Sequence, residues 1–148
     1  MTTLTFNDRV NTAVSIVTEQ YPDAKLYESD AKATGGPTTD PDKINEMTVK
    51  FQNVNNSTVI IKEISPGKFG KPELVDAPLL EDVVIQWPMD LSRANQLKEA
   101  AGFKEPYTTV NLRNPLGPQK GNPLLIFGNG SSQFVFVDTV TGKVTTGN

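Results

Sequence analysis

Two segments of the chain follow the same order of secondary-structure patterns. A helix-like stretch that begins at Val10 precedes three strand-like stretches, and another that begins at Leu91 precedes three more. The first strand of each unit, near Ala24 and near Glu105, lies 81 residues from its counterpart, as do the two helix starts. One such unit is barely large enough to bury a core alone. The sequence therefore predicts an α+β fold of two tandem α-β-β-β repeats, with both helices packed on one face of an antiparallel sheet.

The repeats give the expected boundaries. Residues 1–64 form the first repeat, 65–88 a connector, and 89–148 the second repeat, with one core shared between the two repeats. Three prolines and two glycines between Ser65 and Leu80 favour a connector. Its last part, 83–87, is apolar enough for an extra strand.

The first repeat begins with an amphipathic helix. Five residues fall at helical spacing on one face: Val10, Ala13, Val14, Val17 and Tyr21. Thr5 or Asn7 can cap its start, and Pro22 ends it at Tyr21. A weak strand follows over 24–33. A hairpin then pairs 47–51 with 58–64 around an Asn-rich turn, because apolar and polar residues alternate in the first of these strands.

The second helix begins at an N-cap, Asp90, and ends before Gly102. Its expected apolar face is Leu91, Ala94, Leu97 and Ala101. On this face Leu97→Ala should cost roughly 2 to 5 kcal/mol. Lys98→Ala, one position round the helix, should cost less than about 0.5 kcal/mol.

Strands are expected at 107–112, 124–127 and 133–137, followed by a turn and a short strand or tail over 138–144. Two Gly/Pro-rich loops, 34–42 and 114–122, occupy matched places in the two units. A solvated connector and a binding loop are both compatible with the composition of these loops.

Composition excludes several classes of function. The chain has no cysteine and no histidine, which removes disulfides, thiolate zinc sites and serine–histidine catalysis. A net charge of −3 with mixed signs gives no basic face for nucleic acid. No stretch approaches the roughly 20 apolar residues of a transmembrane helix. We therefore expect a protein that is not an enzyme and binds no cofactor, metal, nucleic acid or membrane.

Four local patterns have a simple structural interpretation. Asp82 and Asp90 could form a carboxylate pair, but Asp90 already serves as a helix cap. The segment 128–132 resembles a phosphate loop but favours a hairpin turn, since no helix follows it. Asp40, Asp42 and Glu46 lack the spacing of a calcium loop. Asn56 and Asn129 each begin an N-glycosylation sequon, but we expect no glycosylation in a chain that shows no leader.

The end of the chain resembles a known family. The run from Phe134 to Val144, with an aspartate followed by a Thr-Gly-Lys turn and a valine, is similar to the closing strand and turn of the PepSY domain. The resemblance covers about the last 55 residues, and the first unit lacks this ending. It implies a helix packed on an antiparallel sheet. It also implies a binding or inhibitory module of a kind linked to peptidases and found outside the cytoplasm.

The leading hypothesis is a non-catalytic protein-binding or inhibitory module, whose partner is a peptidase or another enzyme. Binding would use the open face of the sheet and the two loops. The expected contact residues are Trp87, Thr38, Thr39, Asp40, Leu116, Gln119 and Lys120. Trp87 has two interpretations, a core residue at the seam between the halves or a surface anchor.

Two alternatives stay open. One is an enzyme or small-ligand carrier with a pocket between helices and sheet, built from Tyr21, Tyr27, Tyr107 and lysines. The other is a structural protein that pairs through a sheet edge, so that monomer and homodimer are both compatible with the sequence. The N-terminus shows no signal peptide, which predicts a cytoplasmic location, or an extracytoplasmic one if Met1 was added to a mature chain.

Overall fold

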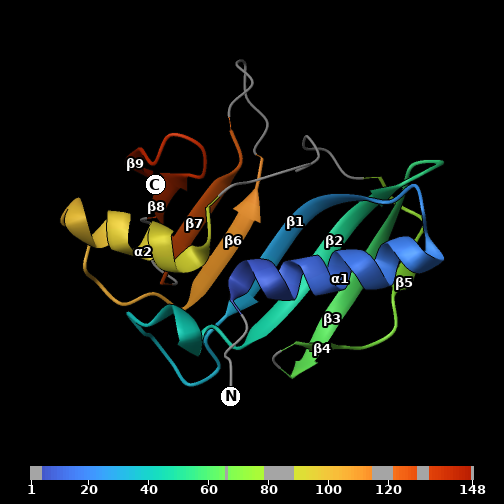
Figure 1. Cartoon of the computed structure of the whole chain (residues 1–148), viewed down its shortest axis with the longest axis horizontal. Helices are drawn as coiled ribbons and strands as arrows, with labels where there is room; N and C mark the ends of the chain where they lie inside the picture. Colours follow the sequence, from blue (N-terminus) through green and yellow to red (C-terminus); the bar gives the residue numbers. More distant parts are fainter. Residues whose placement is uncertain (1–4, 66, 79–88, 115–121, 130–133, 148) are drawn as a thin grey trace.

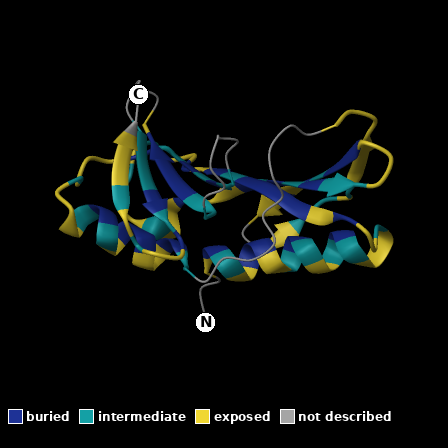
Figure 2. Ribbon diagram, turned by 90° about the horizontal axis from the view of Figure 1, so that it is seen from above, coloured by how far each residue is buried: buried dark blue, intermediate teal, exposed yellow. Residues whose placement is uncertain are grey.

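The computed structural model describes residues 5–65, 67–78, 89–114, 122–129 and 134–147. Two helices cover one face of a nine-stranded antiparallel sheet. Figure 1 shows α1 crossing in front of β1, β2 and β3, and α2 lying in front of β6, β7 and β8. Figure 2 shows both helices on the same side of the sheet. The opposite side, called here the open face, has no helix over it in the described part of the chain.

The sheet order is β4-β3-β2-β1-β6-β7-β8-β9, and β5 also pairs with β3. The first four strands are β1 (Lys25–Lys32), β2 (Glu46–Asn53), β3 (Ser57–Ser65) and β4 (Lys68–Phe69). The other five are β5 (Glu73–Val75), β6 (Thr109–Arg113), β7 (Leu124–Gly128), β8 (Phe134–Asp138) and β9 (Val144–Gly147). The central pair is β1 and β6, the first strands of the two predicted repeats.

The first helix, α1 (Phe6–Gln20), begins at a capping box in which Thr5 and Asp8 bond each other's backbone N–H groups. It is confirmed in place, although it starts earlier than the spacing indicated and Tyr21 is its C-cap. Val10, Ala13 and Val17 are fully buried. The helix also buries a cation, Arg9, against the sheet.

The hairpin of β2 and β3 is confirmed, and alternation explains it. Met47, Val49 and Phe51 are buried beneath α1, while the residues between them point to the open face. Asn55 and Asn56 form the turn with positive φ angles of 59° and 58°, which asparagine tolerates better than most residues.

The second helix, α2 (Leu91–Ala100), begins at Asp90 as predicted, and Gly102 follows its end with a φ of 97°. Its buried face was predicted only in part. Alongside Leu91 and Ala94 the structure buries Asn95 and Lys98, whereas Leu97 is half-buried and Ala101 is exposed. The reason is that residues 91, 94, 95 and 98 stand at i, i+3, i+4 and i+7, a complete helical face, whereas Ala101 lies beyond the end of this short helix.

The remaining strands were located correctly by their patterns. Parts of the predicted connector form β4 and β5, which both pair with β3, while 83–87 lies outside the described residues. One hydrophobic cluster includes residues from both halves of the chain, among them Val10, Phe51, Leu91, Leu125 and Val137.

Candidate functional site

Three of the predicted contact residues lie in a segment that packs against the second half. Thr38 and Tyr107 exchange two backbone hydrogen bonds of 2.9 Å, and the carbonyl of Thr39 accepts one of 3.3 Å from Asn95 on α2. Asp40 caps a short 3₁₀ turn over Pro41–Lys43. The side chains of Thr39 and Asp40 are exposed, so they stay available for a partner. Trp87, Leu116, Gln119 and Lys120 lie outside the described residues.

An ionic cluster occupies the middle of the open face. This charged patch comprises Glu28, Asp30, Lys50, Asn111 and Arg113. The ammonium of Lys50 lies 3.5 Å from a carboxylate oxygen of Glu28 and 3.5 Å from one of Asp30. Arg113 approaches Glu28 to 3.6 Å, and Asn111 donates a hydrogen bond to Asp30. The patch joins β1, β2 and β6 through their side chains.

Glu28 has an unusual environment for a carboxylate on a sheet face. It is only 8% exposed, and its burial is the main cause that raises its pKa to about 7. A hydrogen bond with Asp30 and the charge of Asp30 raise the pKa further, while Lys50 and Arg113 partly offset these effects. Glu28 therefore changes charge near neutral pH, which makes the charge of the patch depend on pH.

Next to the charged patch, the open face becomes apolar. The register places Arg113 opposite Leu124, and Asn111 opposite Ile126, which in turn pairs with Phe136. We call this region the apolar band; its members are Leu124, Ile126, Phe134 and Phe136. Ile126 is buried, and the other three are half-buried. An apolar band beside an ion cluster differs from the polar surface of a solvated sheet face.

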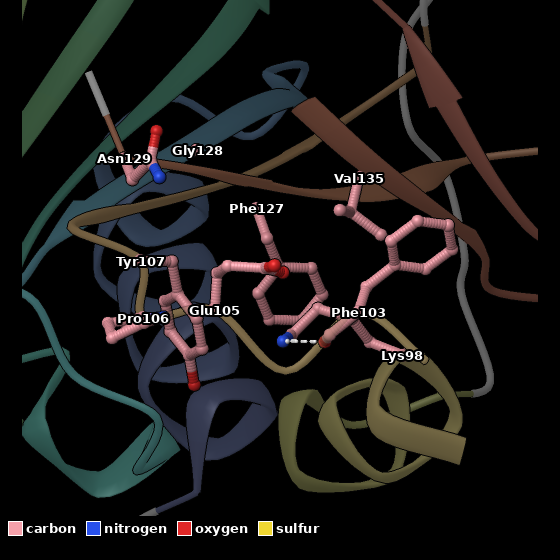
Figure 3. Close-up of a pocket in the computed structure, with 9 residues that line it drawn as sticks. All are labelled: Lys98, Phe103, Glu105, Pro106, Tyr107, Phe127, Gly128, Asn129 and Val135. Atoms are coloured by element: carbon pink, nitrogen blue, oxygen red, sulfur yellow. Dashed lines mark hydrogen bonds between the residues drawn. The ribbon is translucent and has the colours of Figure 1, made fainter. Parts of the chain in front are cut away.

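A pocket of about 120 Å³ lies on the helix side of the second half, and Lys98 is among the residues that line it. Its ammonium donates a hydrogen bond of 2.6 Å to the carbonyl of Phe103 and lies 5.3 Å and 5.5 Å from the ring centres of Tyr107 and Phe127. The two rings meet edge to face at 4.9 Å. Figure 3 shows the amine of Lys98 among these side chains. We call this site the Lys98 pocket.

Burial lowers the pKa of Lys98, and the carboxylates of Glu99 and Glu105 only partly oppose the shift. Burial also raises the pKa of Tyr107, with Asp40 and Glu99 adding to the rise. Tyr107 is 2% exposed, and its hydroxyl points away from the other labelled side chains in Figure 3. The pocket thus holds a cation that is easier to neutralise than an ordinary lysine, beside a phenol that stays protonated.

The three tyrosines of the small-ligand hypothesis lie on different elements. Tyr21 caps α1, Tyr27 belongs to β1, and Tyr107 alone lines the Lys98 pocket. Sequence reasoning missed both Lys98 and Glu28 as site residues. The signal for Lys98 was its helical spacing from Leu91, and the signal for Glu28 was the alternation of charges at positions 28, 30 and 32.

Other candidate groupings are not assembled in the described part of the chain. There, no three Asp, Glu, His or Cys side chains are close enough to hold a metal ion. Asp90 acts as the cap of α2, and Asp82 is outside the described residues. No described helix is both long enough and apolar enough to cross a bilayer.

Comparison with known proteins gives a fold and nothing more specific. No family model matches the chain, and no curated protein matches it. Among solved structures, the chain is similar to a "putative lipoprotein" from Clostridium difficile 630 with a TM-score of 0.62. The identity is 11%, over 97% of this chain and 93% of that one. At this identity the likeness shows a shared fold alone.

Proposed function

We propose that this protein is a non-catalytic binding or inhibitory module, built from two PepSY-like α-β-β-β repeats, whose open face receives a protein partner. The observation that carries the proposal is the composition of that face. Leu124 and Ile126 of the apolar band lie directly beside the charged patch, and the half-buried Phe134 and Phe136 follow on the next strand. Aromatic side chains such as those of this band are enriched in protein interfaces relative to the rest of the surface.

The arrangement of the strands supports the two-repeat part of the proposal. In each half a helix precedes three consecutive antiparallel strands, and β1 and β6 pair at the centre. Such pairing extends the open face across both units. Thr39 and Asp40 lie beside α2, on the helix side, so their exposed side chains would contribute only if the partner also reaches that side.

The proposal is tested by quantitative affinity capture from the native host. A partner should be recovered by the wild-type protein and lost by Lys62→Glu and by Phe136→Thr. Lys62 is exposed and lies opposite Thr48 on the open face, and Phe136 belongs to the apolar band. Arg93→Glu is the matched control, because it makes the same charge reversal as Lys62→Glu at an exposed position of α2. Denaturant melts would first establish that all three variants are folded.

The expected result is a large loss of partner for the two open-face variants and none for Arg93→Glu. Recovery of the same proteins by all four chains would contradict the proposal. So would the absence of any protein above background with the wild-type chain at native concentration.

A further inference from the structure

The Lys98 pocket lies on the helix side of the sheet, so partner binding by the open face would not involve it. Phe103, Phe127 and Val135 supply apolar walls, while the amine of Lys98 and the carboxylate of Glu105 supply two ionisable groups. Glu105 and Asn129 are exposed, whereas Lys98 is 2% exposed. The pocket therefore leads from a polar rim to an amine held among apolar side chains.

The amine is held in a fixed position. Its hydrogen bond to the carbonyl of Phe103 and its place over the rings of Tyr107 and Phe127 fix its direction. No carboxylate lies within salt-bridge distance of it in the described part of the chain. Desolvated lysines of this kind are the ones that form Schiff bases with carbonyl compounds.

We propose that the Lys98 pocket is a binding site for small apolar aldehydes, which form a reversible imine with the Lys98 amine. This site is independent of the open face. The size of the pocket, about 120 Å³, restricts it to short-chain compounds. Its apolar walls favour a hydrocarbon chain over a polar one.

The reaction balances without any redox partner. The lone pair of the neutral Lys98 Nζ attacks the carbonyl carbon, a C–N bond forms, and the carbonyl oxygen takes a proton as Nζ loses one. The carbinolamine then expels water to give the imine. Glu105, at the rim of the pocket and beyond salt-bridge distance of the amine, would relay the proton from nitrogen to oxygen through one water.

The surroundings that hold the ammonium also suit the protonated imine. That cation keeps one N–H, which can continue to donate to the carbonyl of Phe103. The faces of Tyr107 and Phe127 would stabilise its positive charge as they now stabilise that of the ammonium. Reversal by water returns the free amine.

The test uses the full wild-type chain, with butanal as the aldehyde and cyanoborohydride to reduce the imine to a stable secondary amine. Peptide mass spectrometry then follows each lysine with time. At neutral pH Lys98 should react several-fold faster than the exposed Lys32 and Lys43, because burial lowers the pKa of its amine and leaves more of it neutral. A bulky aldehyde such as naphthaldehyde should modify Lys43 but not Lys98.

Loss of the Glu105 charge favours the neutral Lys98 amine, so a slower reaction at Lys98 in Glu105→Gln, with an unchanged rate at Lys43, isolates the loss of proton relay. Glu19→Gln, an exposed change on α1, is its control. If Lys98 reacts no faster than Lys43 in the folded protein, the amine is structural and the proposal fails. It also fails if the preference persists in urea, because the pocket would then have no part in it.

Discussion

The two helices bury a cation against the same sheet in different ways. Arg9 of α1 donates to both carboxylate oxygens of Glu63, at 2.8 Å from Nε and 2.5 Å from Nη2, and to the carbonyl of Ile44 at 2.7 Å. Glu63 also accepts from the backbone N–H of Gly67. Lys98 of α2 has one carbonyl and two aromatic faces instead.

The two sites differ in whether the buried cation can lose its proton. A guanidinium stays protonated at any ordinary pH and needs its carboxylate when buried. A lysine amine can lose its proton, so a site with a carbonyl and aromatic rings suits both of its states. In the first half, the buried cation therefore forms a permanently charged ion pair that links α1 to β3. The second half holds a buried cation that can change charge.

Among the tests of this comparison, Glu63→Ala should have the largest effect on stability. It leaves the Arg9 guanidinium buried without its carboxylate, and we expect a loss of about 3 to 5 kcal/mol in the free energy of unfolding. Urea denaturation measures it. The double variant Arg9→Met/Glu63→Leu should recover most of the loss, because it removes the charge as well. A double variant as unstable as Glu63→Ala would show that the pair matters for more than its charge balance.

The next test compares neighbours on α2. Lys98→Ala should cost about 1 to 3 kcal/mol, since it removes the donor to the buried carbonyl of Phe103 and the packed aliphatic stem. Leu97→Ala should cost less, because Leu97 is only half-buried. This order is the reverse of the one expected from the sequence. Lys98→Met keeps the stem and isolates the contribution of the amine. Thermal melts that show a greater loss for Leu97→Ala would contradict the observed burial.

An effect of similar size is expected in the charged patch, where Lys50 and Arg113 lie beside Glu28. Burial raises the pKa of Glu28 from 4.5 to about 7, so the folded protein holds a proton that the unfolded chain releases. The free energy of unfolding should therefore fall as pH rises from 4.5 to 7. Glu28→Gln should lack this part of the decline. Parallel pH profiles for the two proteins would show that Glu28 is ordinary.

The smallest expected effect is at alkaline pH. Because the folded-state pKa of Lys98 is lowered, the unfolded chain binds the proton more tightly, and the Lys98 contribution to stability rises as pH approaches about 10.4. Wild type should gain stability relative to Lys98→Met over this range. Comparing the two variants cancels the opposite contribution of Tyr107, which both contain. No change in the difference between them would mean that Lys98 titrates normally.

Local patterns were enough to predict most elements of the fold. The spacing of Val10 and Val17, the alternation from Met47 to Phe51 and the cap at Asp90 each determine an element within a few residues. These features depend on neighbours in the sequence. The rules for helix faces, strand alternation and helix caps can therefore be applied directly to the sequence.

The site residues depended on contacts that are distant in the sequence. Glu28 gains its high pKa only where β1 lies between β2 and β6, and no local pattern gives that register. Lys98 was placed off the apolar face because it stands one position round the helix from Leu97, although its spacing from Leu91 places it on the buried face. Its burial becomes intelligible only when the Phe103 carbonyl and the ring of Phe127, from β7, are known to lie beside it.

The pairing of β1 with β6 has a consequence for the order in which the chain folds. The bond between Asp30 and Asn111 closes a separation of 81 residues, and contacts this distant form late. As the chain leaves the ribosome, β1 can pair with β2 long before β6 is available, so one side of β1 is then an unprotected edge. Alternating charges at positions 28, 30 and 32 discourage that edge from joining a second nascent chain. Two residues of the charged patch in the finished protein, Glu28 and Asp30, are thus expected to have an earlier role in keeping this edge from pairing with another chain.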